Sequence, residues 1–184
     1  MSHPSDTTRL EAPHFIDLRA GKTRTTILTG GLPYHRRWGL RKLDTILSVR
    51  GETERTFRLG IGIDLAHPVP ASLEWLAPDA EVFVETSPAP ATTSGWLFHL
   101  GAKNVVATWW EPVVEAERIV GFRARLLETE GRRCRAGLRS FRALHSAHTT
   151  DFEGRRSSEL PVEDDRVTVE IGAHQWMELE CRFL

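Results

Sequence analysis

The sequence predicts an all-β protein: an antiparallel β-sandwich, either one large sandwich or a two-sheet super-sandwich, with little helix. Turn-forming residues recur at short intervals, and the segments between them are rich in Val, Ile, Thr, Phe and Trp. Several of these segments alternate strictly between apolar and polar residues, as in Arg166–Ile171. This period of two is typical of a strand with one buried face. No segment keeps a helical period over the length of a convincing helix.

The first half of the chain predicts a short tail followed by four strands. Residues 1–11 are polar and carry no apolar run, which indicates a disordered tail rather than a signal peptide, either frayed or marking a cut from a longer chain. Residues 12–184 are expected to form a single β-sandwich domain. Its first strands are expected at His14–Leu18, Thr23–Thr29, Leu43–Val49 and Thr56–Asp64.

The middle of the chain, residues 66–95, predicts an irregular proline-rich stretch within that domain. A short helical turn is expected at Pro70–Leu76, because proline is favoured at the first position of a helix. A strand is expected at Glu81–Glu85, and Ser87–Ser94 has the composition of a linker.

The last part of the chain carries the clearest strand pattern. Strands are expected at Trp96–Leu100, Val105–Trp110, Ile119–Glu128, Arg133–Ser140, Arg166–Ile171 and Gln175–Phe183. Phe122, Ala124 and Leu126 alternate with polar residues before a Glu-Thr-Glu-Gly turn, and Ala136 and Leu138 do so after it. This pattern predicts an antiparallel hairpin, with Glu128 as part of the scaffold. Cys134 and Cys181 fall on inward faces, which predicts reduced core thiols and a cytoplasmic protein.

Composition excludes several classes of partner. The formal net charge of -1 argues against sequence-independent nucleic-acid binding, and no apolar run is long enough to span a membrane. His145 and His148 could share a metal ion on a helix, but they lie between expected strands, so we predict a surface loop there and no metal site. No cofactor is predicted for this chain.

No catalytic residue is predicted either. A glycoside hydrolase needs a pair of carboxylates at a defined separation. The sequence offers no way to pair any two of the candidates. These are Asp17, Asp44, Asp64, Glu74, Glu85, Glu111 and Glu128.

Two groups of residues are candidates for contact with a carbohydrate or another domain. The first is an unusual loop, expected after two glycines, in which aromatic and cationic side chains are crowded together. The alternative interpretation of this loop is a charged hairpin tip. The loop consists of Tyr34, His35, Arg36, Arg37 and Trp38. The second is the pair Trp109 and Trp110, whose rings must project to opposite faces of a strand. One ring is expected in the core and the other on a surface that contacts a sugar or a partner domain.

Three segments resemble the C-terminal β-domain of glycoside hydrolase family 38, the α-mannosidase family. They are Asn104–Thr108 with the strand ending in Arg125–Gly131, then Ala147–Gly154, and then Val167–Leu179. The chain has Ala173–Trp176 where the family has a Pro-aromatic-Glu sequence. The resemblance covers residues 100–184, with weaker support from Leu28–Leu65.

This resemblance implies a β-domain whose catalytic chemistry lies elsewhere. The family's metal-binding and nucleophilic residues belong to a β/α domain, which would be in the same chain or in a separate one and would carry zinc or another divalent metal. The first hypothesis is therefore a non-catalytic accessory domain of an α-mannosidase-like glycoside hydrolase that supports the catalytic domain and contacts carbohydrate. Two alternatives remain open: a freestanding carbohydrate-binding module, and a small glycoside hydrolase with its own carboxylate pair. An oligomer is compatible with each of the three.

Overall fold

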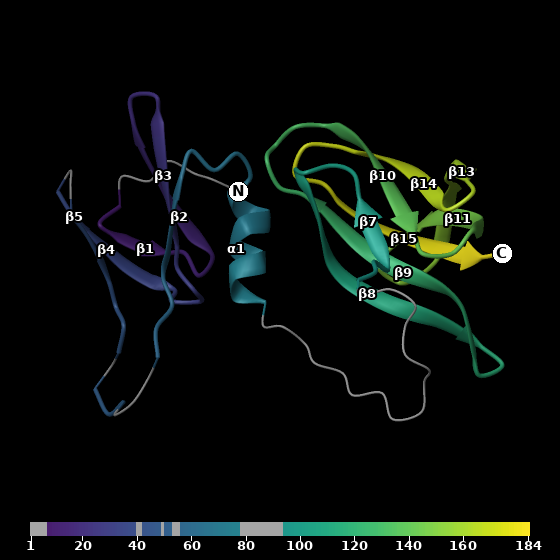
Figure 1. The fold of residues 1–184 in the computed structure, drawn as a ribbon, viewed down its shortest axis with the longest axis horizontal. Helices are drawn as coiled ribbons and strands as arrows, with labels where there is room; N and C mark the ends of the chain where they lie inside the picture. The colour runs from purple at the N-terminus through teal and green to yellow at the C-terminus, as the bar shows by residue number, and fades with distance from the viewer. Residues whose placement is uncertain (1–6, 40–41, 49, 53–55, 78–93) are drawn as a thin grey trace. The chain divides into compact units, whose positions relative to one another are not determined.

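The computed structural model describes residues 7–39, 42–48, 50–52, 56–77 and 94–184, and the chain divides into two compact units (Figure 1). These are an N-terminal unit, Ser2–Phe83, and a C-terminal unit, Val84–Leu184. The sequence predicted a single domain over residues 12–184. The two units arise because each described sheet takes all its strands from one unit. The expected strand Glu81–Glu85, and most of the expected linker Ser87–Ser94, lie outside the described residues.

The N-terminal unit contains two antiparallel three-stranded sheets. One has the order β1-β4-β5 and the other the order β2-β3-β6. The strands are β1 (Arg9–Glu11), β2 (Phe15–Ala20), β3 (Thr23–Leu28), β4 (Tyr34–Trp38), β5 (Lys42–Thr45) and β6 (Gly60–Ile63). β1 falls within the expected tail, because residues 9–11 pair with β4.

One helix follows these strands in the N-terminal unit. Helix α1 (Pro68–Leu76) begins two residues before the expected turn, with proline in its first turn. It packs against β2 and β3. Among the described residues no helix is long and apolar enough to cross a membrane.

The C-terminal unit is a β-sandwich, so the predicted all-β antiparallel fold is confirmed. A four-stranded sheet has the order β13-β14-β10-β7, and a five-stranded sheet has the order β12-β11-β15-β9-β8. The strands are β7 (Phe98–Leu100), β8 (Val105–Glu115), β9 (Arg118–Glu128), β10 (Cys134–Ser140), β11 (Leu144–Thr150), β12 (Arg156–Glu159), β13 (Val162–Glu163), β14 (Arg166–Ile171) and β15 (Trp176–Phe183).

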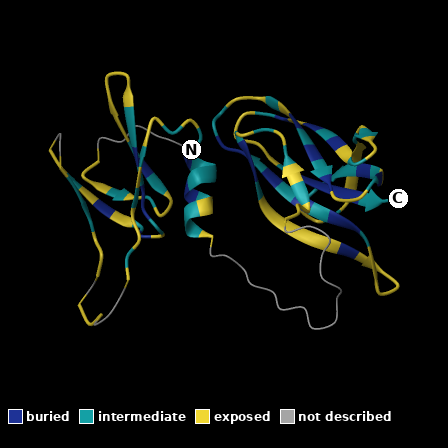
Figure 2. Cartoon of the chain, in the orientation of Figure 1, coloured by how far each residue is buried: buried dark blue, intermediate teal, exposed yellow. Residues whose placement is uncertain are grey.

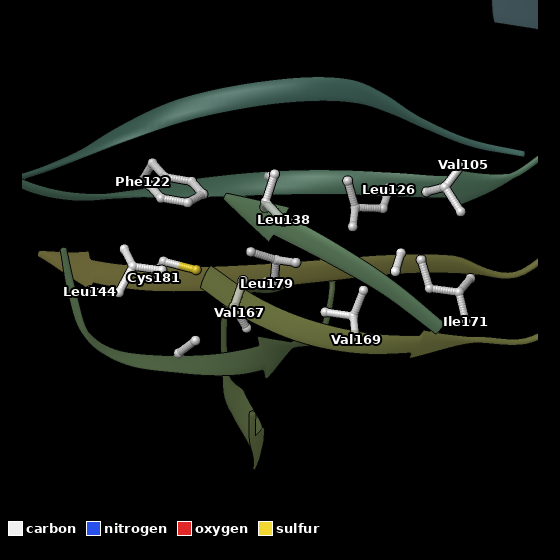
Figure 3. Close-up of a cluster of buried hydrophobic side chains, with 13 residues drawn as sticks. Val105, Phe122, Leu126, Leu138, Leu144, Val167, Val169, Ile171, Leu179 and Cys181 are labelled. Carbon is white, nitrogen blue, oxygen red and sulfur yellow. The ribbon is translucent and has the colours of Figure 1, made fainter. Parts of the chain in front are cut away.

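The core of the sandwich lies between these two sheets (Figure 3). Leu126 and Leu179 come from the five-stranded sheet, Leu138 and Val169 come from the four-stranded sheet, and all four are fully buried. Cys181 is also fully buried, and burial raises the pKa of its thiol to about 12. Both cysteines are free, and Cys134 packs against this core as predicted.

The predicted hairpin between Phe122 and Leu138 is wrong. Strand β9 pairs with β8 and β15, whereas β10 pairs with β7 and β14 in the opposite sheet. The connection is therefore an arch that crosses from one sheet to the other. Its two apolar rows face each other across the core, so burial is satisfied without any hydrogen bond between the strands.

The expected loop around His145 and His148 is also wrong, because both residues lie in strand β11. Its inward residues Leu144 and Ala147 are buried in the core, with a register shift between Leu144 and Ser146. This irregularity breaks the strict alternation, so the segment lacks the pattern that identifies a strand.

Candidate functional site

The carboxylate of Glu128 is the most highly coordinated group of the C-terminal unit. Its side chain is fully buried at the end of β9 and lies on the same inward face of the strand as Leu126. Three backbone N–H groups of the arch donate to its two oxygens at 2.8 to 3.1 Å. These donors are Glu130, Gly131 and Arg132.

Two further donors to Glu128 come from distant parts of the chain. The side-chain amide of Asn104 donates at 2.9 Å, and the backbone N–H of His174 donates at 2.9 Å. Burial alone would raise the pKa of Glu128, but these hydrogen bonds outweigh burial and lower it to about 2. A carboxylate held ionised by five donors organises the arch and is poorly suited to donate a proton.

A second buried carboxylate lies on the outer face of the five-stranded sheet. Glu180 on β15 is only 3% exposed, because three guanidinium groups cover it. Arg123 and Arg182 donate through Nε at 2.9 Å, and Arg156 donates at 2.7 Å. Burial raises the pKa of Glu180, but the hydrogen bonds from Arg156, Arg123 and Arg182 lower it to about 2.

Glu178 lies two residues before Glu180 on β15, on the same outer face. It accepts a hydrogen bond from Nε of Arg125 at 2.7 Å and is 8% exposed. The guanidinium of Arg125 lies 5.5 Å from the centre of the Trp109 ring and 5.1 Å from that of Phe152. Both rings are solvent-exposed, Phe152 more so. The outer face therefore combines exposed aromatic rings with a network of paired charges.

The two adjacent tryptophans of β8 point to opposite sides of the strand, as predicted, but neither is buried in the core, where one ring was expected. Trp109 is paired with Arg125 on the outer face, and Trp110 is paired with Ala124, which lies in the core. The Trp110 ring stacks on Phe98 with their centroids 4.2 Å apart, yet it remains 38% exposed. Each tryptophan therefore presents a ring to solvent on its own side of the sheet.

Trp110 belongs to a cluster of five aromatic rings that bridges the two sheets. We call this the aromatic cluster; its rings lie 4.2 to 6.3 Å apart. It consists of Phe98, Trp110, Phe122, Phe141 and Phe183. β7 and β8 are edge strands, so the stack of Phe98 on Trp110 joins the edges of the two sheets.

Part of the aromatic cluster is accessible at the surface. Phe122 is buried, but Phe141 is 46% exposed. The neighbouring Leu97 is also exposed and accepts a hydrogen bond from the backbone N–H of Phe141. Figure 2 shows that most of β8, which carries Trp110, is exposed. The C-terminal unit thus displays an apolar surface that includes one of the predicted tryptophans.

The segment Tyr34–Trp38, expected as a loop, is the central strand β4 of its sheet. Tyr34, Arg36 and Trp38 share its exposed face, and the Arg36 guanidinium lies 3.6 Å from the centre of the Trp38 ring. Arg37 lies on the other face, paired in register with Leu43. The structure therefore brings three of the five predicted residues together on one exposed strand face.

His35 faces away from that surface. It is 3% exposed, and its ring nitrogens lie 3.0 Å from the Thr45 hydroxyl and 3.2 Å from the Ala12 carbonyl oxygen. Both nitrogens are thus engaged within the unit. His35 fastens β4 to its neighbours and has no free nitrogen for a ligand.

Sequence reasoning missed the residues that complete the outer face and the aromatic cluster. Phe152 lies outside any strand, and Phe141 follows β10 directly, so neither belongs to an alternating pattern. Glu178 and Glu180, at alternate positions of one strand, were the available signal. Like charges on one strand face predict cross-strand ion pairs, and Arg125 and Arg123 lie opposite them.

In the described part of the chain, no group of three or more His, Cys, Asp or Glu side chains could hold a metal ion. Neither known protein families nor curated proteins give a match to this chain.

Proposed function

We propose that this chain is a non-catalytic β-sandwich accessory domain of an α-mannosidase-like glycoside hydrolase. Its partner would be a β/α catalytic domain in the same or a separate chain, which would carry the divalent metal. The resemblance of residues 100–184 to the C-terminal domain of that family suggested this role. The observation that best supports it is the exposed part of the aromatic cluster.

An accessory domain needs an apolar surface to hold its catalytic partner. The exposed rings of Trp110 and Phe141, together with Leu97, supply such a surface. Large exposed apolar groups that lie together are typical of protein–protein contacts. Trp110 is also anchored by its stack on Phe98, so it is held in place before any partner binds.

The carboxylates favour this role over independent catalysis. A general acid in a glycoside hydrolase has a raised pKa, whereas the pKa values of Glu128 and Glu180 are lowered to about 2. Asp151 and Asp165 also have lowered pKa values, because Arg155 and Arg139 respectively donate to them. A small glycoside hydrolase with its own carboxylate pair is therefore the least supported alternative.

The two adjacent tryptophans allow a matched test of the docking surface. The chain is mixed with an α-mannosidase catalytic β/α domain that lacks its own C-terminal β-domain, and binding is followed by calorimetry and by turnover of an aryl α-mannoside with zinc. We expect Trp110→Ala to weaken binding at least tenfold, because buried tryptophans dominate interfaces. Trp109→Ala, one residue away on the opposite face, should leave binding unchanged. Equal loss in both variants would contradict the proposal.

The outer face of the five-stranded sheet favours a second candidate function, a carbohydrate-binding module. Trp109 and Phe152 flank Arg125 and are exposed, which gives rings for stacking beside hydrogen-bonding groups. Tyr34 and Trp38, on either side of Arg36, offer a similar surface on the N-terminal unit. Both surfaces combine exposed aromatic rings with a guanidinium group.

A glycan array separates the two candidates. If the chain is a carbohydrate-binding module, it binds at least one oligosaccharide, and either Trp109→Ala or Trp38→Ala abolishes that binding while Trp110→Ala does not. Failure to bind any oligosaccharide removes this candidate. Turnover of aryl α-mannosides by the purified chain alone, lost on replacing a single carboxylate, would instead favour independent catalysis.

A further inference from the structure

Strand β6 at the edge of the N-terminal sheet exposes a row of aliphatic side chains. Within the described residues it pairs with β3 only, in the order β2-β3-β6. Leu59, Ile61 and Ile63 are 46%, 77% and 61% exposed. The residues between them are Gly60 and Gly62. On the opposite face of the strand, Gly60 lies against the side chain of Leu28 and Gly62 against that of Leu65. An apolar edge of this kind is a template for another strand.

The backbone of β6 also presents hydrogen-bonding groups to that open edge. The N–H of Asp64 donates to the carbonyl oxygen of Arg24 on the β3 side at 2.7 Å. In an antiparallel ladder the direction of these groups alternates from residue to residue. The N–H and C=O groups of Ile61 and Ile63 therefore point away from β3.

The sequence around β6 is complementary to itself. In an antiparallel pair of two copies centred on Ile61, Leu59 lies opposite Ile63, and Gly60 lies opposite Gly62. Arg58 and Asp64, which carry opposite charges, flank the two ends of this pair, and the carboxylate of Asp64 also accepts a hydrogen bond from the backbone N–H of Arg24 at 2.8 Å. Both of these charged residues are exposed.

We propose that β6 pairs with β6 of a second copy of this chain, in antiparallel register about Ile61. The two three-stranded sheets then form one continuous six-stranded sheet across a two-fold axis. The hydrogen bonds of the edge backbone supply affinity, and the two aliphatic rows lie side by side and bury part of each other. A strand this short buries less than the roughly 800 Å² per partner of a typical stable interface, so the dimer dissociates on dilution.

Analytical ultracentrifugation of the full chain over a range of concentrations tests the dimer. The weight-average mass should rise from 20.8 kDa towards twice that value between about 1 and 200 µM, the range in which a weak complex forms. Ile61→Lys should abolish this rise. Ile119→Lys is the matched control, because Ile119 is an exposed strand residue of the C-terminal unit and its replacement should leave the rise intact. A mass constant at 20.8 kDa, or a dimer that survives Ile61→Lys, would overturn the proposal.

Cysteines introduced one at a time in a Cys134→Ser background, where the remaining Cys181 is fully buried, test the register. Residues 61 of the two copies lie opposite each other, with Cα atoms about 5.5 Å apart, within the range of a disulfide. Ile61→Cys should therefore form a disulfide-linked dimer under mild oxidation. Ile63→Cys alone should not, but should cross-link when mixed with Leu59→Cys. No cross-link at position 61, or a cross-link of Ile63→Cys alone, would overturn the register.

Discussion

Replacing Glu128 with glutamine should destabilise the C-terminal unit by about 3 kcal/mol or more. The glutamine amide nitrogen cannot accept a hydrogen bond, and in its best orientation it replaces Oε1, which accepts from Asn104 and Glu130. Losing two hydrogen bonds to a charged group costs about 1.5–3 kcal/mol each. The same hydrogen bonds lower the pKa of Glu128 from 4.5 to about 2, which corresponds to about 3 kcal/mol and lies within that range.

The buried thiol of Cys181 gives an assay that reports on this unit alone. Its alkylation at rising urea concentration, read by mass spectrometry of the peptide that contains it, follows the opening of the C-terminal core. Glu170→Gln is the matched control, because its exposed side chain forms an ion pair with the exposed Arg133 and its replacement should cost less than about 1 kcal/mol. A loss below about 1 kcal/mol for Glu128→Gln, or equal losses in both variants, would refute the reasoning.

Two further predictions concern pH and the N-terminal unit. Because the folded-state pKa values of Glu128 and Glu180 lie below the ordinary value of 4.5, their stabilisation is complete above about pH 4.5 and is lost as the pH falls towards 2. The urea midpoint measured by circular dichroism should fall over that window, and a flat profile would contradict the assignment. His35→Ala should destabilise the N-terminal unit by about 1–3 kcal/mol, because its loss leaves buried partners unsatisfied. Tyr34→Ala, at the adjacent exposed position, should cost little, and hydrogen exchange of the peptide that contains β4 compares the two variants.

The sequence predicted the strands around the arch but not their partners. The alternation of Phe122, Ala124 and Leu126 requires one buried face, and a hairpin and an arch satisfy that requirement equally well. The choice between them depends on contacts with β15 and β14, which are distant in sequence. Glu128 was the local sequence signal for the arch. A carboxylate on the inward face at the end of a strand needs several hydrogen-bond donors, and the backbone of an arch supplies them.

The faces of the candidate residues could be predicted from the sequence only where their segment is recognisable as a strand, because successive side chains of a strand point to opposite faces. Trp109 and Trp110 satisfy this condition, so the sequence assigned them correctly to opposite faces. Tyr34–Trp38 does not, because the buried residue of β4 is the polar His35 and no apolar alternation is visible. A histidine satisfied by Thr45 and Ala12 is recognisable only once those segments are known to be neighbours.

The donors of the Glu128 carboxylate limit where a fragment or circular permutant of the C-terminal unit can begin and end. These donors extend from Asn104 to His174, so they span most of that unit although the carboxylate itself is a single group. A fragment that begins after Asn104 or ends before His174 would bury the same charge with part of its coordination missing. Any excised or permuted version of this sandwich should therefore keep those two residues and place its new ends elsewhere, for example between the strands Arg156–Glu159 and Val162–Glu163.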